Sequence, residues 1–317
     1  MRSARHWSAR LALSSALWLS LPAWGQDVAQ WVARMNQALT TLDYHGDLVY
    51  LHGGQMEALR LYHAGGASVR ERLVSVSGVP REVIRDGGRI VCIGTSAAPS
   101  LYADGGSAAP LLGALPGPGG VGLDPYYSLV LGGTERIAGL DAQQVEVRPR
   151  DAYRYGYRLW LERATGLPLK SVRFGADGRA VEQIMFTRIA LNERPSEADL
   201  GTIAIEGAGQ VALDRPQPAS TTTAPWRVIS PPDGFVLRLQ RPPAADASVH
   251  LVYSDGLANV SVYVEPLRAQ VPAFSGAANR GALNLYGRVL EGRQITVLGD
   301  VPAATVERFA QGVTAGG

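Results

Sequence analysis

The chain has 317 residues, of which 46% are hydrophobic and 18% are charged, and its mean hydropathy is +0.00. At ~150 residues per domain this length fits two domains, and the apolar content is too high for a disordered protein. The 37 Gly and 20 Pro are spread without a period, which excludes collagen-like and coiled-coil chains and favours short antiparallel strands joined by turns.

Residues 1–25 have the pattern of a secretory signal peptide. Three arginines precede an apolar run over residues 11–21, and the small residues Ala23 and Gly25 follow it. That run is shorter than the ~20 residues that a membrane-spanning helix needs. Because three of the 30 basic residues lie in this leader, the remainder has 27 basic against 28 acidic residues. We therefore expect a soluble protein exported to the periplasm, without a nucleic-acid partner.

Residues 26–205 form the first predicted domain. Apolar side chains recur every three or four positions over residues 26–42, as in an amphipathic helix, and Trp31 is one of them. After this helix, the sequence consists of short runs with alternating apolar and polar residues, as in β-strands, and these runs form two meanders. Strands are expected over residues 48–51, 56–63, 68–75, 81–85, 89–93, 143–147, 153–162, 167–174 and 181–191. Residues 94–125, rich in Gly, Ala, Pro and Ser, predict a long mobile loop.

The second meander has apolar side chains on both faces. In the strand over 153–162 one face carries Tyr157, and the other carries Trp160. Residues 181–189 are apolar on both sides, so we expect the first helix to cover part of the sheet. Such a curved sheet is either filled by its own side chains or leaves an apolar hollow for an acyl chain, and both remain open. Trp31, Tyr157 and Trp160 are the candidate lining residues.

Residues 206–225 predict an interdomain linker, because they are rich in Pro, Thr, Ala and Gly and poor in large apolar groups. A smaller α+β domain is expected over residues 226–317. Its predicted elements are strands over 235–239, 249–253, 260–265 and 294–298, a hairpin turn at 254–256 and a helix over 302–311.

The sequence carries no catalytic signature. Residues 117–122 match GxGxxG, but they lack the preceding strand and the following helix of a dinucleotide site. His45, His52 and His63 lie on neighbouring predicted strands, although their spacing is not that of a metal site. The single cysteine, Cys92, lies in an apolar strand and is expected to be buried and inert. We therefore predict a binding protein without a catalytic residue, metal or cofactor.

One stretch is dense in charge. Arg72, Arg81 and Arg85 lie with Glu71 and Glu82 on consecutive predicted strands. The structural interpretation is that these residues form a solvated face of cross-strand ion pairs, each of which contributes little to stability. The functional interpretation is that these arginines bind the phosphate of a lipid or the carboxylates of a partner.

Several phrases together resemble one family of proteins. They are LDYHGDLVY at 42–50, ERLVSVSGVPREVIR at 71–85, YRYGYRLWLE at 153–162, TGLPLK at 165–170, EQIMFT at 182–187 and HLVYSDGLA at 250–258. In number and order they are similar to the RseB/MucB family of periplasmic regulators of the envelope-stress sigma factor. The resemblance covers both predicted domains and the leader.

The resemblance implies a fold and a function. The implied fold is α+β and mainly antiparallel, with a large unclosed β-barrel covered by helices, like that of lipoprotein carriers, and a smaller C-terminal domain. The implied function is negative regulation, in which the protein binds the periplasmic domain of a membrane anti-sigma factor and shields it from a regulatory protease. Lipid or lipopolysaccharide would release that partner, and residues 226–317 would contact it. A periplasmic lipid or lipoprotein carrier is the alternative, and a homodimer is left open.

Overall fold

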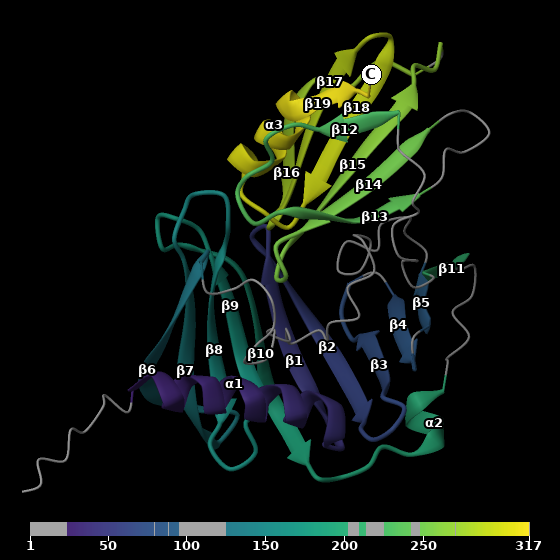
Figure 1. The fold of residues 1–317 in the computed structure, drawn as a ribbon. Coiled ribbons are helices and arrows are strands. Elements are labelled where there is room, and N and C mark those ends of the chain that lie inside the picture. Colours follow the sequence, from purple (N-terminus) through teal and green to yellow (C-terminus); the bar gives the residue numbers. More distant parts are fainter. Residues whose placement is uncertain are drawn as a thin grey trace, which may run out of the picture.

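The structure is a computed structural model that describes residues 24–78, 80–87, 89–94, 125–201, 209–213, 225–241, 248–269 and 271–316. Two lobes follow one another along the chain, and each is built on an antiparallel sheet (Figure 1). Most of the expected signal peptide, nearly all of the expected loop over 94–125 and most of the expected linker lie outside the described residues.

The first lobe is an eleven-stranded sheet in the order β11-β5-β4-β3-β2-β1-β10-β9-β8-β7-β6. Its two meanders join where β1 pairs antiparallel with β10, and the described sheet ends at β11 and β6, so it is unclosed. The strands are β1 Tyr44–His52, β2 Gln55–Ala64, β3 Arg70–Ser75, β4 Arg81–Asp86, β5 Arg89–Gly94, β6 Tyr127–Ile137, β7 Leu140–Pro149, β8 Gly156–Glu162, β9 Pro168–Phe174, β10 Ala180–Leu191 and β11 Gly209–Leu213.

The helix α1 (Trp24–Thr41) runs across the strands of this sheet (Figure 1). Its apolar positions Val32, Met35 and Leu39 are 3%, 0% and 1% exposed and belong to one core cluster with strand residues such as Leu48 and Phe186. The three-and-four spacing therefore produces both the helix and its packing face. The prediction that the first helix covers part of the sheet is confirmed. The single-turn helix α2 (Glu197–Leu200) contacts β3 and β2.

The second lobe is a six-stranded sheet in the order β13-β14-β15-β18-β17-β16, with α3 (Ala303–Gly312) packed on it. Its strands are β13 Val236–Arg241, β14 Val249–Ser254, β15 Asn259–Pro266, β16 Gly276–Arg280, β17 Leu283–Leu290 and β18 Arg293–Gly299. A short pair, β12 (Trp226–Val228) and β19 (Val313–Ala315), brings the start and the end of this lobe together. The expected α+β class is confirmed in both lobes.

The structure adds elements that the sequence did not predict. β6 was missed because Gly132 and Gly133 interrupt its apolar pattern, and its pairing with β7 shifts register there. β16 and β17 were missed because their side chains do not alternate cleanly in hydrophobicity. β11 lies within the expected linker, where it adds a strand next to β5.

Candidate functional site: the curved sheet and the junction of the lobes

The three aromatic side chains predicted to line a hollow do not share one surface. Trp31 packs partly buried against the core of the first lobe. Strand alternation places Tyr157 and Trp160 on opposite faces of β8. Tyr157 shares its face with Leu161, which is 0% exposed, and burial raises the pKa of the Tyr157 hydroxyl. Trp160 faces the other way, with the Lys170 ammonium 4.2 Å from its ring centroid.

Two of the three predicted arginines form buried ion pairs. Arg72 Nε donates to Glu82 Oε1 at 2.6 Å, and these side chains are 4% and 1% exposed. Arg85 Nη1 lies 2.8 Å from Glu71 Oε2, and both of these side chains are 8% exposed. The interpretation of this cluster as a solvated face is wrong for these two pairs, because little of either is in contact with water.

The register also separates the arginines. Arg72, on β3, lies opposite Ile84 of β4 and shares its face of the sheet. Arg85 follows Ile84 directly, so its side chain points to the other face. Arg81 shares the face of Arg85, is 28% exposed and pairs with Glu57. The structure thus brings Arg81 and Arg85 to one face and Arg72 to the other. Each guanidinium already faces a carboxylate of the chain, and ligand binding by these residues stays a prediction.

The three histidines of the first two strands have separate surroundings. His63 is fully buried, and its ring nitrogens lie 2.9 and 3.0 Å from carbonyl oxygens at and just beyond the end of α1. His52 Nε2 lies 3.1 Å from Glu57 Oε1, and His45 Nε2 lies 3.6 Å from Glu193 Oε2. Within the described part of the chain, no three His, Cys, Asp or Glu side chains gather as a metal site requires.

A buried ion pair joins the two lobes. Arg154, just before β8, donates through Nε to Oδ2 of Asp255 at 2.7 Å, and both side chains are 0% exposed. The same oxygen accepts a hydrogen bond from Tyr127 Oη at 2.9 Å. Asp255 Oδ1 accepts the backbone N–H groups of Leu257 and Ala258 at 2.9 and 2.8 Å. One carboxylate therefore holds both the turn between β14 and β15 and the contact between the lobes.

The guanidinium of Arg154 is held on several sides at once. Its Nη1 donates to the carboxylate of Asp151, and its Nη2 donates to the carbonyl oxygen of Asp233. The rings of Tyr126 and Phe235 lie with their centroids 4.6 and 4.9 Å from its central carbon. Because the first of these rings belongs to one lobe and the second to the other, the side chain is enclosed by both.

Further polar contacts continue this junction. Arg173 Nη1 lies 3.1 Å from Asp300 Oδ2, which follows β18 in the second lobe. Asn284 Nδ2, on β17, donates to Tyr155 Oη at 2.9 Å, and both residues are buried. Leu257, at the tip of the turn between β14 and β15, packs partly buried against the core of the first lobe. The lobes therefore meet through specific polar contacts and through apolar packing that includes Leu257.

The junction residues carry no distinguishing signal of their own in the sequence. The turn at 254–256 was predicted correctly, and Arg154 and Asp255 both lie in phrases that carry the family resemblance. What was missing is the pairing itself, because the two residues are 101 positions apart and a single sequence gives no signal for such a contact. A lone Arg and a turn Asp are each ordinary by themselves.

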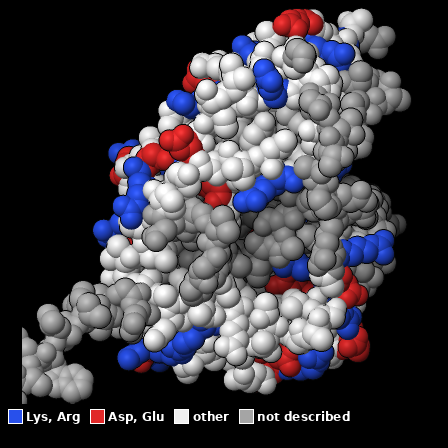
Figure 2. All heavy atoms as spheres, viewed as in Figure 1, with Lys and Arg blue, Asp and Glu red and all other residues white. Residues whose placement is uncertain are grey.

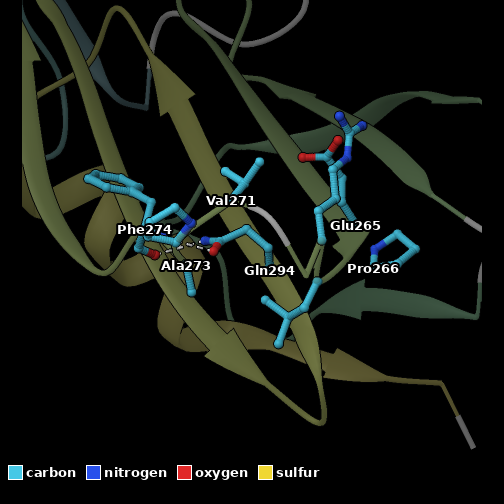
Figure 3. A pocket seen from close by; sticks show the side chains of 9 residues that line it. Glu265, Pro266, Val271, Ala273, Phe274 and Gln294 are labelled. Atoms are coloured by element: carbon cyan, nitrogen blue, oxygen red, sulfur yellow. Dashed lines mark hydrogen bonds between the residues drawn. The ribbon is translucent and has the colours of Figure 1, made fainter.

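The second lobe also carries a hollow of 260 Å³ beside the connection from β15 to β16 (Figure 3). Gln294 accepts the Phe274 N–H at 2.9 Å and donates to the Phe274 carbonyl oxygen at 2.8 Å, which fixes the connection against β18. The Phe274 ring lies against Gly287, where a Cβ atom would come within 2.2 Å of it. Leu267, Val271 and Phe274 remain 44%, 59% and 37% exposed, so the hollow has an apolar rim.

The visible surface in Figure 2 mixes basic and acidic side chains rather than segregating them by sign. This agrees with the near balance of 27 basic and 28 acidic residues outside the first 25. Among the described residues, no helix is long and apolar enough to cross a membrane.

Comparisons with known proteins give consistent results over nearly the whole chain. The models of the MucB/RseB N-terminal domain and the MucB/RseB C-terminal domain match residues 27–204 and 220–314. The sigma factor AlgU regulatory protein MucB of Pseudomonas aeruginosa is 33% identical over 294 residues, 90% of each chain. The sigma-E factor regulatory protein RseB of Escherichia coli is 26% identical over 289 residues, 89% of each chain.

Two solved structures agree in fold as well as in sequence. A complex of Pseudomonas aeruginosa MucA and MucB matches with a TM-score of 0.72 at 30% identity, covering 92% of this chain and 99% of that one. A crystal structure of MucB matches with a TM-score of 0.66 at 29% identity, covering 92% of this chain and 98% of that one. With both of its domains matched in order, this chain belongs to the MucB/RseB family.

Proposed function

We propose that this chain is a periplasmic negative regulator of an envelope-stress sigma factor. It binds the periplasmic part of a membrane anti-sigma factor and shields that segment from regulatory proteolysis, and lipid or lipopolysaccharide releases it. The observation that carries the proposal is the likeness, over both lobes, to a MucB that has been solved in complex with the periplasmic part of MucA.

The architecture suits a shielding role. A protease needs an accessible, extended segment, so occupying that segment is enough to inhibit cleavage. An extended tail loses conformational entropy on binding, and a wide surface is needed to compensate for that loss. Two lobes joined by a buried junction offer such a surface as one unit. We assign the main contact to residues 226–317, where Leu267, Val271 and Phe274 form an exposed apolar rim.

The first lobe is where we place the lipid. The space along the concave face of its sheet is already occupied in part by Met35 and Leu39 of α1, which are 0% and 1% exposed. An acyl chain that enters here must therefore displace side chains of α1, which couples lipid binding to the position of the helix. Of the predicted arginines, Arg81 is the one with a substantially exposed side chain, so we expect it to meet the lipid phosphate first.

Direct binding tests the proposal. Residues 26–317 are purified and titrated, in a calorimeter, with the periplasmic segment of the anti-sigma factor from the same organism. A periplasmic segment of equal length from an unrelated membrane protein serves as the control. We expect saturable binding of the first segment alone, weakened when lipopolysaccharide micelles are present. Equal heats for both segments would contradict the proposal.

The carrier alternative makes a different prediction for the same protein. A carrier would move a fluorescent phospholipid between vesicles and would not bind the anti-sigma segment. Deleting residues 226–317 is a poor way to separate the two functions, because it would expose Arg154 and strip Tyr127 of its partner Asp255. The intact chain is therefore the right material for both assays.

A further inference from the structure

We propose that the ion pair between Arg154 and Asp255 is a conformational lock that fixes the two lobes in one arrangement, and that regulation acts by opening it. The lock is formed by the chain alone, so its existence does not depend on which partner or lipid the protein binds. Its use as the regulated element rests on the function proposed above.

The geometry makes this pair selective for one arrangement. The guanidinium is a planar fork whose three nitrogens donate to three different acceptors. Nε donates to Asp255 and Nη2 to the carbonyl oxygen of Asp233, both in the second lobe, whereas Nη1 donates to Asp151 in the first lobe. A small rotation of one lobe would break the bonds to Asp255 and Asp233 together. By contrast, Leu257 packs against the first lobe through apolar contact, which is non-directional and therefore less sensitive to small shifts.

The same pair is suited to opening. Both side chains are 0% exposed, so closing the junction removes two charges from water. Opening returns both charges to water, and this hydration offsets much of the lost attraction. Such a pair therefore specifies the position of the lobes more than it adds to their stability. A ligand that favours the open form can shift the balance by its difference in affinity for the two forms.

The first lobe provides a route from the sheet to the lock. Tyr127, which donates to Asp255, is the first residue of β6, and α1 packs against β6. Burial, and then the charge of Asp255, raise the pKa of the Tyr127 hydroxyl, so it remains a hydrogen-bond donor to the carboxylate. A lipid that moves α1 away from the sheet would disturb the strand that carries this donor.

The test measures the arrangement of the lobes without partner or lipid. Nitroxide labels are attached at Ala164→Cys and Ala304→Cys, two exposed positions, one in each lobe. The native Cys92 is buried, and burial raises the pKa of its thiol, so it reacts slowly with the label. Pulsed electron paramagnetic resonance then gives the distribution of distances between the labels.

Two variants open the lock in different ways. Asp255→Asn removes the charge but keeps an oxygen for the N–H groups of Leu257 and Ala258. Arg154→Lys keeps the charge but loses the fork. We expect one narrow distribution for the parent and at least a doubling of its width in both variants. Circular dichroism checks that each variant is folded, and Tyr127→Phe replaces Asp255→Asn if that chain unfolds.

The matched control is Asp177→Asn. Asp177 also accepts a backbone N–H in a hairpin turn and faces an arginine, Arg179, but the pair is 61% and 87% exposed and lies within one lobe. We expect the parent distribution for this control. Narrow distributions in the folded lock variants, or a parent as broad as they are, would overturn the proposal. Since no anti-sigma segment is present, this experiment tests the lock independently of whether the chain binds an anti-sigma factor.

Discussion

At the residue scale, the main feature of this protein is a set of buried arginines, each paired with a carboxylate of opposite charge. The side chains of Arg72, Arg85 and Arg154 are 4%, 8% and 0% exposed, and each faces a carboxylate. A buried ion pair need not stabilise a fold relative to apolar residues, yet removing one partner leaves an uncompensated charge in the interior. A single substitution at such a pair should therefore destabilise the fold more than replacement of both partners by apolar residues.

The pair between Arg72 and Glu82 gives the first prediction. Glu82→Gln should lower the free energy of unfolding of the first lobe by about 3–5 kcal/mol, because Arg72 stays buried without its carboxylate. The double variant Arg72→Met with Glu82→Leu should recover most of this loss. Urea unfolding followed by circular dichroism measures both.

The control for that series is an exposed pair with the same chemical change. Glu135 lies 3.8 Å from the Lys170 ammonium and its side chain is 49% exposed. Glu135→Gln should change the free energy of unfolding by less than about 1 kcal/mol. A loss as small as this in Glu82→Gln would contradict the assignment of a buried, coupled pair.

His250 gives a prediction for pH. Burial, and then the charge of Arg241, lower the pKa of this histidine from 6.5 to about 4. The unfolded chain therefore takes up a proton near pH 6.5 while the folded chain stays neutral, so stability is lost as the pH falls from 6.5 toward 4. The loss attributable to His250 is about 2 kcal/mol between about pH 7.5 and about pH 5.

The variant His250→Phe measures this contribution, because a phenyl ring can keep the stacking on Tyr263. Urea unfolding of the parent and of the variant is compared at the two pH values. The parent should lose more stability than the variant on acidification. A difference between the two proteins that does not change with pH would contradict the lowered pKa.

At the element scale, the connection from β15 to β16 is where we expect the partner to make apolar contact. Val271 lies on this connection and is 59% exposed. Val271→Glu should weaken binding of the anti-sigma segment at least tenfold, or about 1.4 kcal/mol, since a charge would enter an apolar interface. Calorimetric titration measures the affinity.

Val76 offers a matched control, because it is also an exposed valine, at 57%, but it follows β3 in the first lobe. Val76→Glu should bind the segment as the parent does. Equal weakening by both substitutions would point to a general effect of added negative charge, and would contradict a specific contact at the β15–β16 connection.

The elements themselves show what a single sequence can and cannot predict. The period of apolar residues is local, so α1 and most strands of the two meanders were predicted within a few residues. β6 failed because a glycine pair breaks the alternation, and β11 failed because its five residues lie in a stretch with the composition of a linker. Pairing with β5, rather than local propensity, makes β11 a strand.

The candidate site was predicted less completely, for a related reason. Composition and spacing placed Arg72, Arg81 and Arg85 near glutamates, and each of them pairs with one, but the strand register divides the three arginines between two faces of the sheet. The burial of Arg72 depends on α2 as well as on the neighbouring strands, since Arg72 also donates to the carbonyl oxygen of Asp199 in α2. The lock between Arg154 and Asp255 depends on the approach of two lobes, which no local pattern encodes.

At the scale of the whole molecule, the two lobes form a unit with the features of a regulated clamp. The first lobe has a curved sheet covered by a helix, the second carries an exposed apolar rim, and a buried polar junction connects them. If lipid and partner compete through this junction, each must weaken the binding of the other by the same factor. Shielding of the partner is the outcome on which the proposed function depends.

The rate at which the regulatory protease cleaves the periplasmic segment of the anti-sigma factor tests this most directly. The segment and the protease are incubated with and without an excess of residues 26–317, and again with lipopolysaccharide micelles. If the chain shields the segment, it slows cleavage at least tenfold, and the micelles restore the original rate. An unchanged cleavage rate in the presence of folded, excess chain would contradict shielding.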